Sequence, residues 1–95
     1  ESDVIKDAYL KIRSIIEKNK EAAGHFKNTN HYGIISLTDF SIKLSKKANI
    51  DTKYWIRLKA EIYEKLVDKS IKNNPIAVTS HIEKAMSLYK SINDN

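Results

Sequence analysis

Residues 44–58 read LSKKANIDTKYWIRL, and this stretch decides the fold because it holds the end of one helix, a turn and the start of another. Asn49 stands four residues after the small Ser45, and asparagine is second only to glycine in tolerating the left-handed backbone of such a turn. Ile50 is an aliphatic residue that can be buried between the two helices. Asp51 can then cap the second helix by accepting free amide hydrogens of its first turn. The stretch therefore predicts a tight connection between two packed helices.

Outside this stretch, the apolar spacing is also helical. Apolar side chains recur at three- and four-residue steps, as on one face of a helix, and two glycines and one proline leave few positions for the turns of a sheet. We expect helices over about 3–23, 36–48 and 52–72, and a fourth that starts either at Pro75 with Asn74 as its cap or later at Ser80, boxed with Glu83. The predicted fold class is all-α: residues 1–95 form a single, compact four-helix domain.

Each expected helix has a side that we predict to face the core. The third carries two apolar stripes, Trp55/Leu58/Ile62/Leu66 and Ile56/Tyr63/Val67, which predicts that it lies centrally with a neighbour on each side. The inward residues of the other three are Val4, Ile5, Ala8, Tyr9, Ile12, Ile15 and Ile16 in the first, Phe40, Leu44 and Ala48 in the second, and Ile82, Ala85, Met86, Tyr89 and Ile92 in the fourth.

Residues 24–33, GHFKNTNHYG, predict a helix end followed by a polar connection. Gly24 suits the left-handed conformation that ends many helices. We expect Phe26 and Tyr32 to hold the loop against the core rather than to stack on bases, and Lys27 or His31 to reach a phosphate at its edge. Ile34 and Ile35, which follow the loop, are expected to fill the core.

The sequence gives little support for a metal site or an enzyme. No carboxylate lies between Glu21 and Asp39, and two loop histidines are too few for a zinc site, so we predict no metal and leave the roles of His25, His31 and His81 open. No glycine-rich phosphate loop, nucleophile elbow or paired carboxylates with a histidine is present. We therefore expect neither catalysis nor a cofactor.

Length and composition indicate an ordinary globular domain. The 95 residues include no cysteine, which excludes disulfides and thiolate metal sites. No apolar run approaches the roughly 20 residues that span a bilayer, and there is no signal-peptide pattern, so we predict a cytoplasmic, nucleoid or nuclear location without membrane contact. The chain opens at Glu1 rather than methionine, which leaves open that the domain was excised from a longer protein.

The positive charge is concentrated in one region. The net charge is +5, and 15 of the 17 basic residues are lysines, a bias that codon usage alone could produce. Such a bias would spread the charge evenly along the chain. Residues 1–40 are neutral, as are residues 73–95, whereas residues 43–59 hold six basic side chains and one acidic one. The distribution therefore indicates a basic surface around the turn.

The segment 37–66 resembles the helix-turn-helix motif of DNA-binding proteins. The resemblance lies in residue classes: a large residue followed by a small one (Leu44, Ser45), the turn residue Asn49, an aliphatic residue and a cap, then two apolar anchors (Trp55, Leu58). Asparagine stands where glycine is usual, and Trp55 is bulkier than the common valine or isoleucine, which would widen the angle between the helices. The resemblance implies that residues 52–57 would enter the major groove of DNA.

This interpretation makes the chain a nucleic-acid-binding module that contacts phosphates, and a few bases, of DNA or RNA in replication or transcription regulation. Arg57 is the one residue of the cluster suited to bidentate recognition of guanine. Cations at the start of a helix oppose its dipole, which favours an anionic partner there. The predicted nucleic-acid-binding residues are Lys43, Lys46, Lys47, Thr52, Lys53, Tyr54, Arg57 and Lys59.

Three other interpretations stay open. The lysines can simply form a solvated surface, as charge runs usually do. The domain can instead be a protein-interaction bundle, which predicts that Tyr54, Ile56 and Tyr63 are partly exposed. It can also be an accessory helical domain of a larger replication or regulatory protein, whose other domains would be its partners. The sequence does not fix the oligomeric state.

Overall fold

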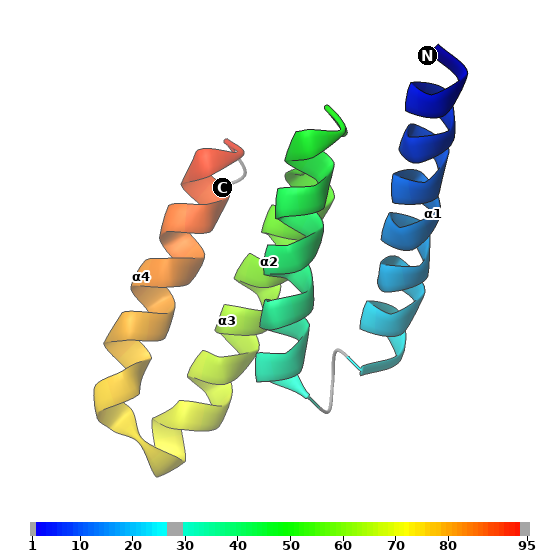
Figure 1. The fold of residues 1–95 in the computed structure, drawn as a ribbon. Helices are drawn as coiled ribbons and strands as arrows, with labels where there is room; N and C mark the ends of the chain where they lie inside the picture. The colour runs from blue at the N-terminus through cyan, green and yellow to red at the C-terminus, as the bar shows by residue number, and fades with distance from the viewer. Residues whose placement is uncertain (1, 27–29, 94–95) are drawn as a thin grey trace.

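The computed structural model describes the backbone of residues 2–26 and 30–93 and the side chains of residues 7–25 and 30–93. Within these ranges the chain forms four helices and no strand: α1 (Ser2–Phe26), α2 (His31–Lys47), α3 (Lys53–Asn73) and α4 (Pro75–Ser91). The prediction of an all-α four-helix domain is confirmed. Figure 1 shows that consecutive helices run in opposite directions.

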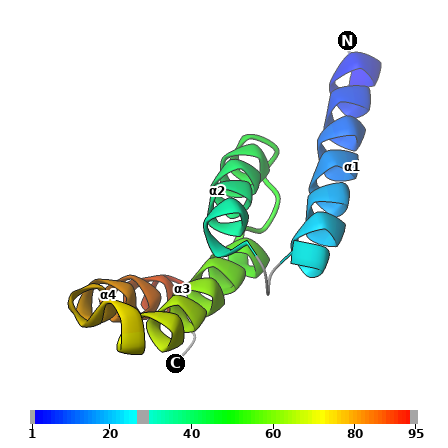
Figure 2. The ribbon, with the colours of Figure 1, turned by 90° about the horizontal axis from the view of Figure 1, so that it is seen from below.

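Within the described part of the chain, the closest backbone packing is between helices that are neighbours in the sequence. α1 lies against α2, α2 against α3, and α3 against α4, so α3 has a neighbour on each side, as its two apolar stripes predict. Figure 2 shows α1 and α4 at opposite ends, with α2 and α3 between them. The molecule measures 55 × 27 × 16 Å along its principal axes. The helices therefore form an open array, in which α1 meets α3 through side chains and the α4 backbone does not approach α1 or α2 closely.

The largest core cluster joins α1, α2 and α3. Trp55 is 1% exposed and confirms the prediction that its indole is a core side chain. On α2, the buried side is built largely from small hydroxyl residues, and the Ser41 hydroxyl accepts a hydrogen bond from Asn19 of α1 at 3.1 Å. Small side chains allow close approach of the helices. The buried members of the cluster are Ile16, Ala23, Ile34, Trp55, Leu58 and Ile62.

The turn between α2 and α3 has the geometry expected from its residues. Asn49 has a φ of 54°, the left-handed value that its side chain tolerates. The Ile50 amide donates to the carbonyl of Ser45 at 2.8 Å, and the Lys53 amide donates to Asp51 Oδ1 at 2.9 Å. Ser45 is fully buried. The predicted turn, its small residue and its cap are therefore all present.

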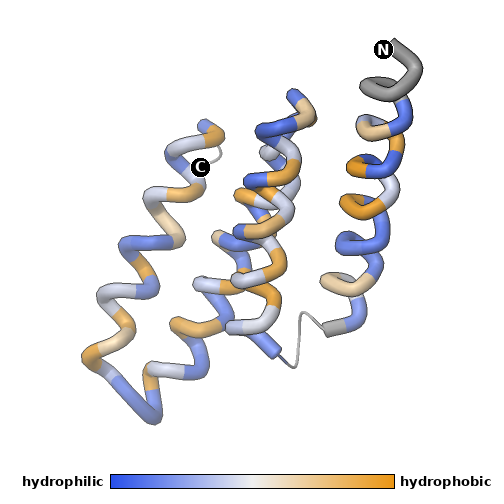
Figure 3. The backbone as a smooth tube through the Cα atoms, viewed as in Figure 1, coloured by the Kyte–Doolittle hydropathy of each residue, from blue (hydrophilic) through white to orange (hydrophobic). Residues whose placement is uncertain are grey.

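The turn between α3 and α4 also agrees with the sequence. Pro75 is the first residue of α4 and Asn74 precedes it as the N-cap residue, although the Asn74 side chain makes no capping hydrogen bond. Figure 3 shows that this turn is hydrophilic, whereas hydrophobic residues occur along all four helices.

The first connection is shorter than we predicted. Gly24 does not end α1, which continues to Phe26, and neither glycine has a positive φ. α2 begins at His31 rather than Ser36, because Asn30 Oδ1 accepts the Gly33 amide at 3.0 Å and starts the helix early. Ile34 is buried as expected, but Tyr32 is 66% exposed and does not hold the loop against the core. The predictions for the Phe26 and Lys27 side chains lie outside the described residues.

Several predicted inward residues are exposed instead. Phe40 is 53% exposed, because α2 turns its Thr38, Ser41 and Ser45 side inward. On α4, Ile82 is 41% and Met86 51% exposed. The buried positions there are Ala85, as predicted, and His81, which the apolar pattern did not identify. On α1, Tyr9 and Ile15 are also exposed, while Val4 and Ile5 lie outside the described side chains.

Candidate functional site

The lysines around the α2–α3 turn are exposed. Lys43, Lys46 and Lys47 lie on the last turns of α2, and Lys53 is the first residue of α3. Within the described ranges, none of these four ammonium groups makes an ion pair. Lys46 and Lys47 also sit where the dipole of α2 favours a cation, which is a structural reason for their presence.

The helical positions of two of these lysines show that they face outward. Successive residues of an α-helix are rotated by about 100°, so a residue two positions from a buried one points away from the core. Lys43 lies two residues from both Ser41 and Ser45, and Lys53 lies two residues from Trp55. Each of these lysines therefore points away from the buried side of its own helix. In the sequence, Lys46, Lys47 and Lys53 flank the turn itself.

The remaining predicted residues have other surroundings. Lys59 Nζ lies 2.6 Å from Asp39 Oδ1, in an ion pair between α3 and α2 that leaves the lysine side chain 21% exposed. Thr52 is half-buried as the residue before α3. Arg57 is exposed and lines a groove between α1 and α3 together with Ala23 and Glu61. The pairing of Lys59 is a correction to the predicted site, since this ammonium group already has a partner.

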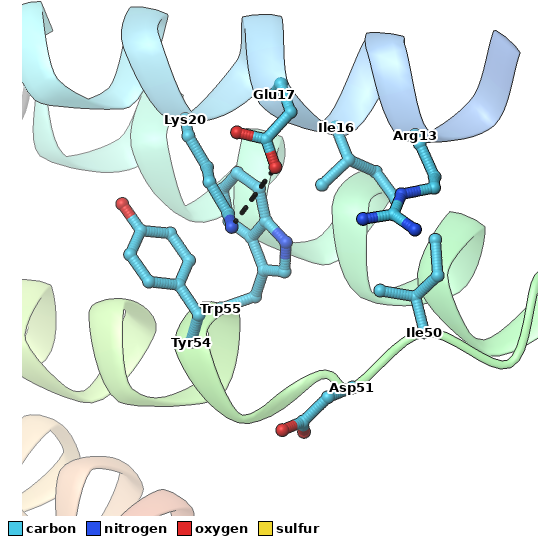
Figure 4. Close-up of a pocket in the computed structure, with 8 residues that line it drawn as sticks. All are labelled: Arg13, Ile16, Glu17, Lys20, Ile50, Asp51, Tyr54 and Trp55. Atoms are coloured by element: carbon cyan, nitrogen blue, oxygen red, sulfur yellow. Dashed lines mark ion pairs between the residues drawn. The ribbon is translucent and has the colours of Figure 1, made fainter. Parts of the chain in front are cut away.

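The start of α3 is flanked by α1, as Figure 4 shows. Lys20 of α1 places its ammonium group 4.7 Å from the centroid of the Tyr54 ring and 3.5 Å from Glu17 Oε1. Tyr54 in turn meets Trp55 edge to face, with ring centroids 5.1 Å apart. The adjoining cavity has a volume of about 250 Å³, and Arg13 lies at its other end beside Ile50 (Figure 4). One face of Tyr54 is thus already occupied by a cation.

Sequence reasoning missed Arg13 and Lys20 because they lie more than twenty residues before the basic cluster. Only the packing of α1 against the core brings them to the α2–α3 turn. Their charges do not make this cavity basic, since Glu17 and Asp51 also line it. Two cations and two carboxylates give no net attraction for a polyanion at this point.

A second groove lies along the α3–α4 hairpin. Its volume is about 410 Å³, and Val67, Ala85 and the exposed side chains of Ile82 and Met86 form its apolar part. Glu64 and Asp68 of α3 line it as well. The Tyr89 hydroxyl donates to the Glu64 carboxylate and ties α4 to α3 at one end of the groove.

The charge of this groove is opposite to that of the chain. No lysine or arginine of the described residues lines it, and both of its ionisable carboxyl groups come from α3. Elsewhere on α3, Tyr63 and Ile56 are half-buried, and Tyr54 is 46% exposed. These exposures agree with what a protein-interaction bundle predicts.

Comparison with protein-family models, curated proteins and solved structures found no significant match to this chain. Among the described helices, none combines the length and the apolar character that crossing a bilayer requires. The described residues also contain no group of three or more His, Asp or Glu side chains arranged to hold a metal ion.

Proposed function

We propose that this domain is a protein-interaction module without catalytic activity, and that its α3–α4 groove binds a cationic amphipathic helix of a partner protein. The observation that carries the proposal is an apolar groove with an acidic edge on a chain whose net charge is +5. The net positive charge of the chain would favour acidic partners. The acidic edge of this groove favours a basic partner instead.

The apolar part of the groove supports a helical partner. Helices bind to hydrophobic grooves through side chains at i, i+3 or i+4, and i+7. Ile82 and Met86 are one helical turn apart and expose 41% and 51% of their surface. Methionine is unbranched and polarizable, which lets it adapt to the side chains of a partner. Exposed apolar surface of this kind commonly marks interaction sites.

The acidic edge supports a basic partner. Glu64 and Asp68 are four residues apart on α3 and so lie along the same side of the helix. Lysine or arginine residues beside the apolar stripe of a bound helix would lie near both carboxylates. Such pairs at the rim of an interface increase the association rate and select the partner more than they increase affinity.

A pair of model peptides tests the proposal. Both form amphipathic helices with the same leucine stripe, and the polar positions are lysine in one and glutamate in the other. In an NMR titration of the whole chain, we expect the lysine peptide to shift the signals of Val67, Ile82 and Met86. The double substitution Ile82→Lys/Met86→Lys should weaken binding at least about tenfold, or 1.4 kcal/mol. Ile76→Lys is the matched control, because Ile76 is on α4, 90% exposed and outside the groove.

Three results would count against this function. These are equal affinity for the two peptides, equal weakening by Ile76→Lys, and shifts located away from the α3–α4 groove. If the chain instead associates with itself, and Ile82→Lys/Met86→Lys abolishes that association, the groove belongs to a second copy. Sedimentation analysis over a range of concentrations separates these cases.

Nucleic-acid binding is a second candidate, favoured by the exposed ammonium groups of Lys46, Lys47 and Lys53 around one turn, which make no ion pair with the described residues. It also agrees with the resemblance of residues 37–66 to a helix-turn-helix motif. On this hypothesis, affinity for duplex DNA falls with salt by about 0.9 logarithmic unit per phosphate contacted. A fluorescence anisotropy titration at several salt concentrations measures this slope.

The control for this second candidate has the same net charge as the test variant. Lys46→Ala/Lys47→Ala/Lys53→Ala should abolish binding and reduce the salt slope. The exposed lysines Lys11, Lys18 and Lys90 lie elsewhere, and replacing these three by alanine removes the same charge. Equal loss of binding in both triple variants would attribute the affinity to net charge alone and exclude a site at the turn.

A further inference from the structure

A polar pocket lies at the end of the molecule opposite the α2–α3 turn. α2 begins there, α3 ends there and α4 begins there, so three helix ends surround a cavity of about 320 Å³. The side chains with polar atoms include Asn30, His31, Lys69, Ser70, Asn74 and His81. None of the described residues that line the pocket is an aspartate or glutamate.

The first turn of α2 offers backbone donors to this pocket. The helix itself provides no acceptor for its first amides. Asn30 Oδ1 accepts the Gly33 amide, and the Ile34 amide makes the first regular helical bond, to the carbonyl of Asn30. The amides of His31 and Tyr32 have no acceptor among the described residues, and they lie at the positive end of the helix dipole. Such a pair of amides is suited to an anion.

Lysines of α3 add positive potential. Lys69 lines the pocket, and burial together with the charges of Lys69 and Lys65 lowers the pKa of His31 below 6.5. The effect on His31 shows that the charges of these two lysines reach the mouth of the pocket. An anion bound there would be attracted by Lys69 and by the His31 ring when it is protonated.

His81 is a second, independent feature of this pocket. This side chain is 9% exposed, and its Nδ1 atom is buried without a hydrogen-bond partner among the described residues. The ring contacts Tyr63, with centroids 5.9 Å apart, and lines the pocket from α4. A buried polar atom without a partner is costly, by roughly 1–3 kcal/mol, and usually has a functional or solvent explanation.

We infer that this pocket is a binding site for a small phosphate-class oxyanion. Lys69 would supply the ammonium group, the α2 amides of His31 and Tyr32 would donate to oxygens, and His81 would donate from its ring nitrogen. Each of these groups is a donor, and the lining contains no anionic oxygen that could hold a cation instead. The site is separate from the groove of the proposed function, with which it shares no residue.

An NMR titration with inorganic phosphate tests the site. Chloride is exchanged for phosphate at constant ionic strength and neutral pH, and amide and histidine-ring signals of the intact chain are followed. We expect saturable shifts at His31, Tyr32 and His81, and a rise in the pKa of His31, because a bound anion stabilises the imidazolium form. Glycerol 3-phosphate is titrated in parallel, so that tighter binding of the ester would identify an esterified phosphate as the natural occupant.

The substitution Lys69→Gln should reduce phosphate affinity at least about tenfold. Lys72→Gln is the matched control, since Lys72 is an exposed lysine on the same helix that does not line the pocket. The absence of saturation at millimolar phosphate, or identical affinities of wild type and Lys69→Gln, would overturn the inference. Neither result would affect the peptide binding at the α3–α4 groove.

Discussion

At the residue scale, His31 shows how its neighbours set a protonation equilibrium. Burial first, and then the positive charges of Lys69 and Lys65, lower its pKa from the usual 6.5. The folded chain therefore binds fewer protons than the unfolded chain when the pH lies between the two pKa values. It follows that the contribution of His31 to the unfolding free energy is complete above pH 6.5 and is lost as the pH falls toward its folded pKa.

Lys69→Gln should raise the pKa of His31 in the absence of phosphate. Removal of one of the two cations leaves burial and Lys65 as the remaining causes, so the pKa should move toward 6.5 without reaching it. The pH dependence of stability near and below pH 6.5 should become shallower. Histidine NMR titrations and urea unfolding at several pH values measure both effects. An unchanged pKa of His31 in Lys69→Gln, or an equal rise in Lys72→Gln, would contradict the conclusion that the charge of Lys69 lowers this pKa.

At the element scale, substitutions at the two glycines test how much the Asn30 cap contributes to the start of α2. Both lie inside helices, where alanine is usually more stable than glycine by about 0.5–1 kcal/mol. Gly24 has no atom within 4 Å of the position of an added Cβ, whereas at Gly33 that atom would lie 2.5 Å from Asn30 Nδ2. The alanine at 33 would thus displace the side chain that caps α2.

Gly24→Ala should therefore raise the unfolding free energy by about 0.5–1 kcal/mol. Gly33→Ala should give no such gain, because loss of the Asn30 cap costs about 1 kcal/mol and offsets the higher helix propensity. Urea unfolding followed by circular dichroism measures both variants. Equal stabilisation by the two substitutions would show that the Asn30 side chain does not contribute to the start of α2.

The ends of the helices were predictable where a single residue constrains the backbone of a turn. Asn49 and Pro75 determine the backbone at their own positions, so the two later turns were predicted closely. The start of α2 was not predicted closely. Glycine favours a loop, but the cap from Asn30 makes Gly33 helical. Phe40 was also wrongly placed, since three small polar residues outweigh one large apolar residue when helices approach closely.

The candidate sites were less predictable than the helices. Charge counts located the lysines but did not give the side of the helix from which each one points. The α3–α4 groove and the pocket of His31, Lys69 and His81 combine residues that are far apart in the sequence. The residues that line each of these sites depend on which helix faces pack together. Nothing in the sequence around His81 predicted that its side chain is buried.

At the scale of the whole molecule, the described helices approach closely only where they are neighbours in the sequence, and this arrangement leaves much surface exposed. The exposed area is 6771 Å², whereas a compact protein of this mass exposes roughly 5600 Å². Large apolar side chains are exposed on all four helices, for example Leu10, Phe40, Ile71 and Ile82. Both observations follow from α1 and α4 lying at opposite ends of the array, and both favour a module that is covered by a partner.

The open array predicts a large radius of gyration in solution. The Cα atoms give 15.4 Å, while a compact domain of this length has about 12 Å. Small-angle X-ray scattering at low concentration should therefore give a value above that of a compact domain, with an elongated distance distribution. A value near 12 Å would mean that α1 or α4 folds over the central pair and covers the α3–α4 groove. Ile82→Lys/Met86→Lys decides between these arrangements, because it should leave the scattering unchanged if the groove is open and expand the molecule if it is covered.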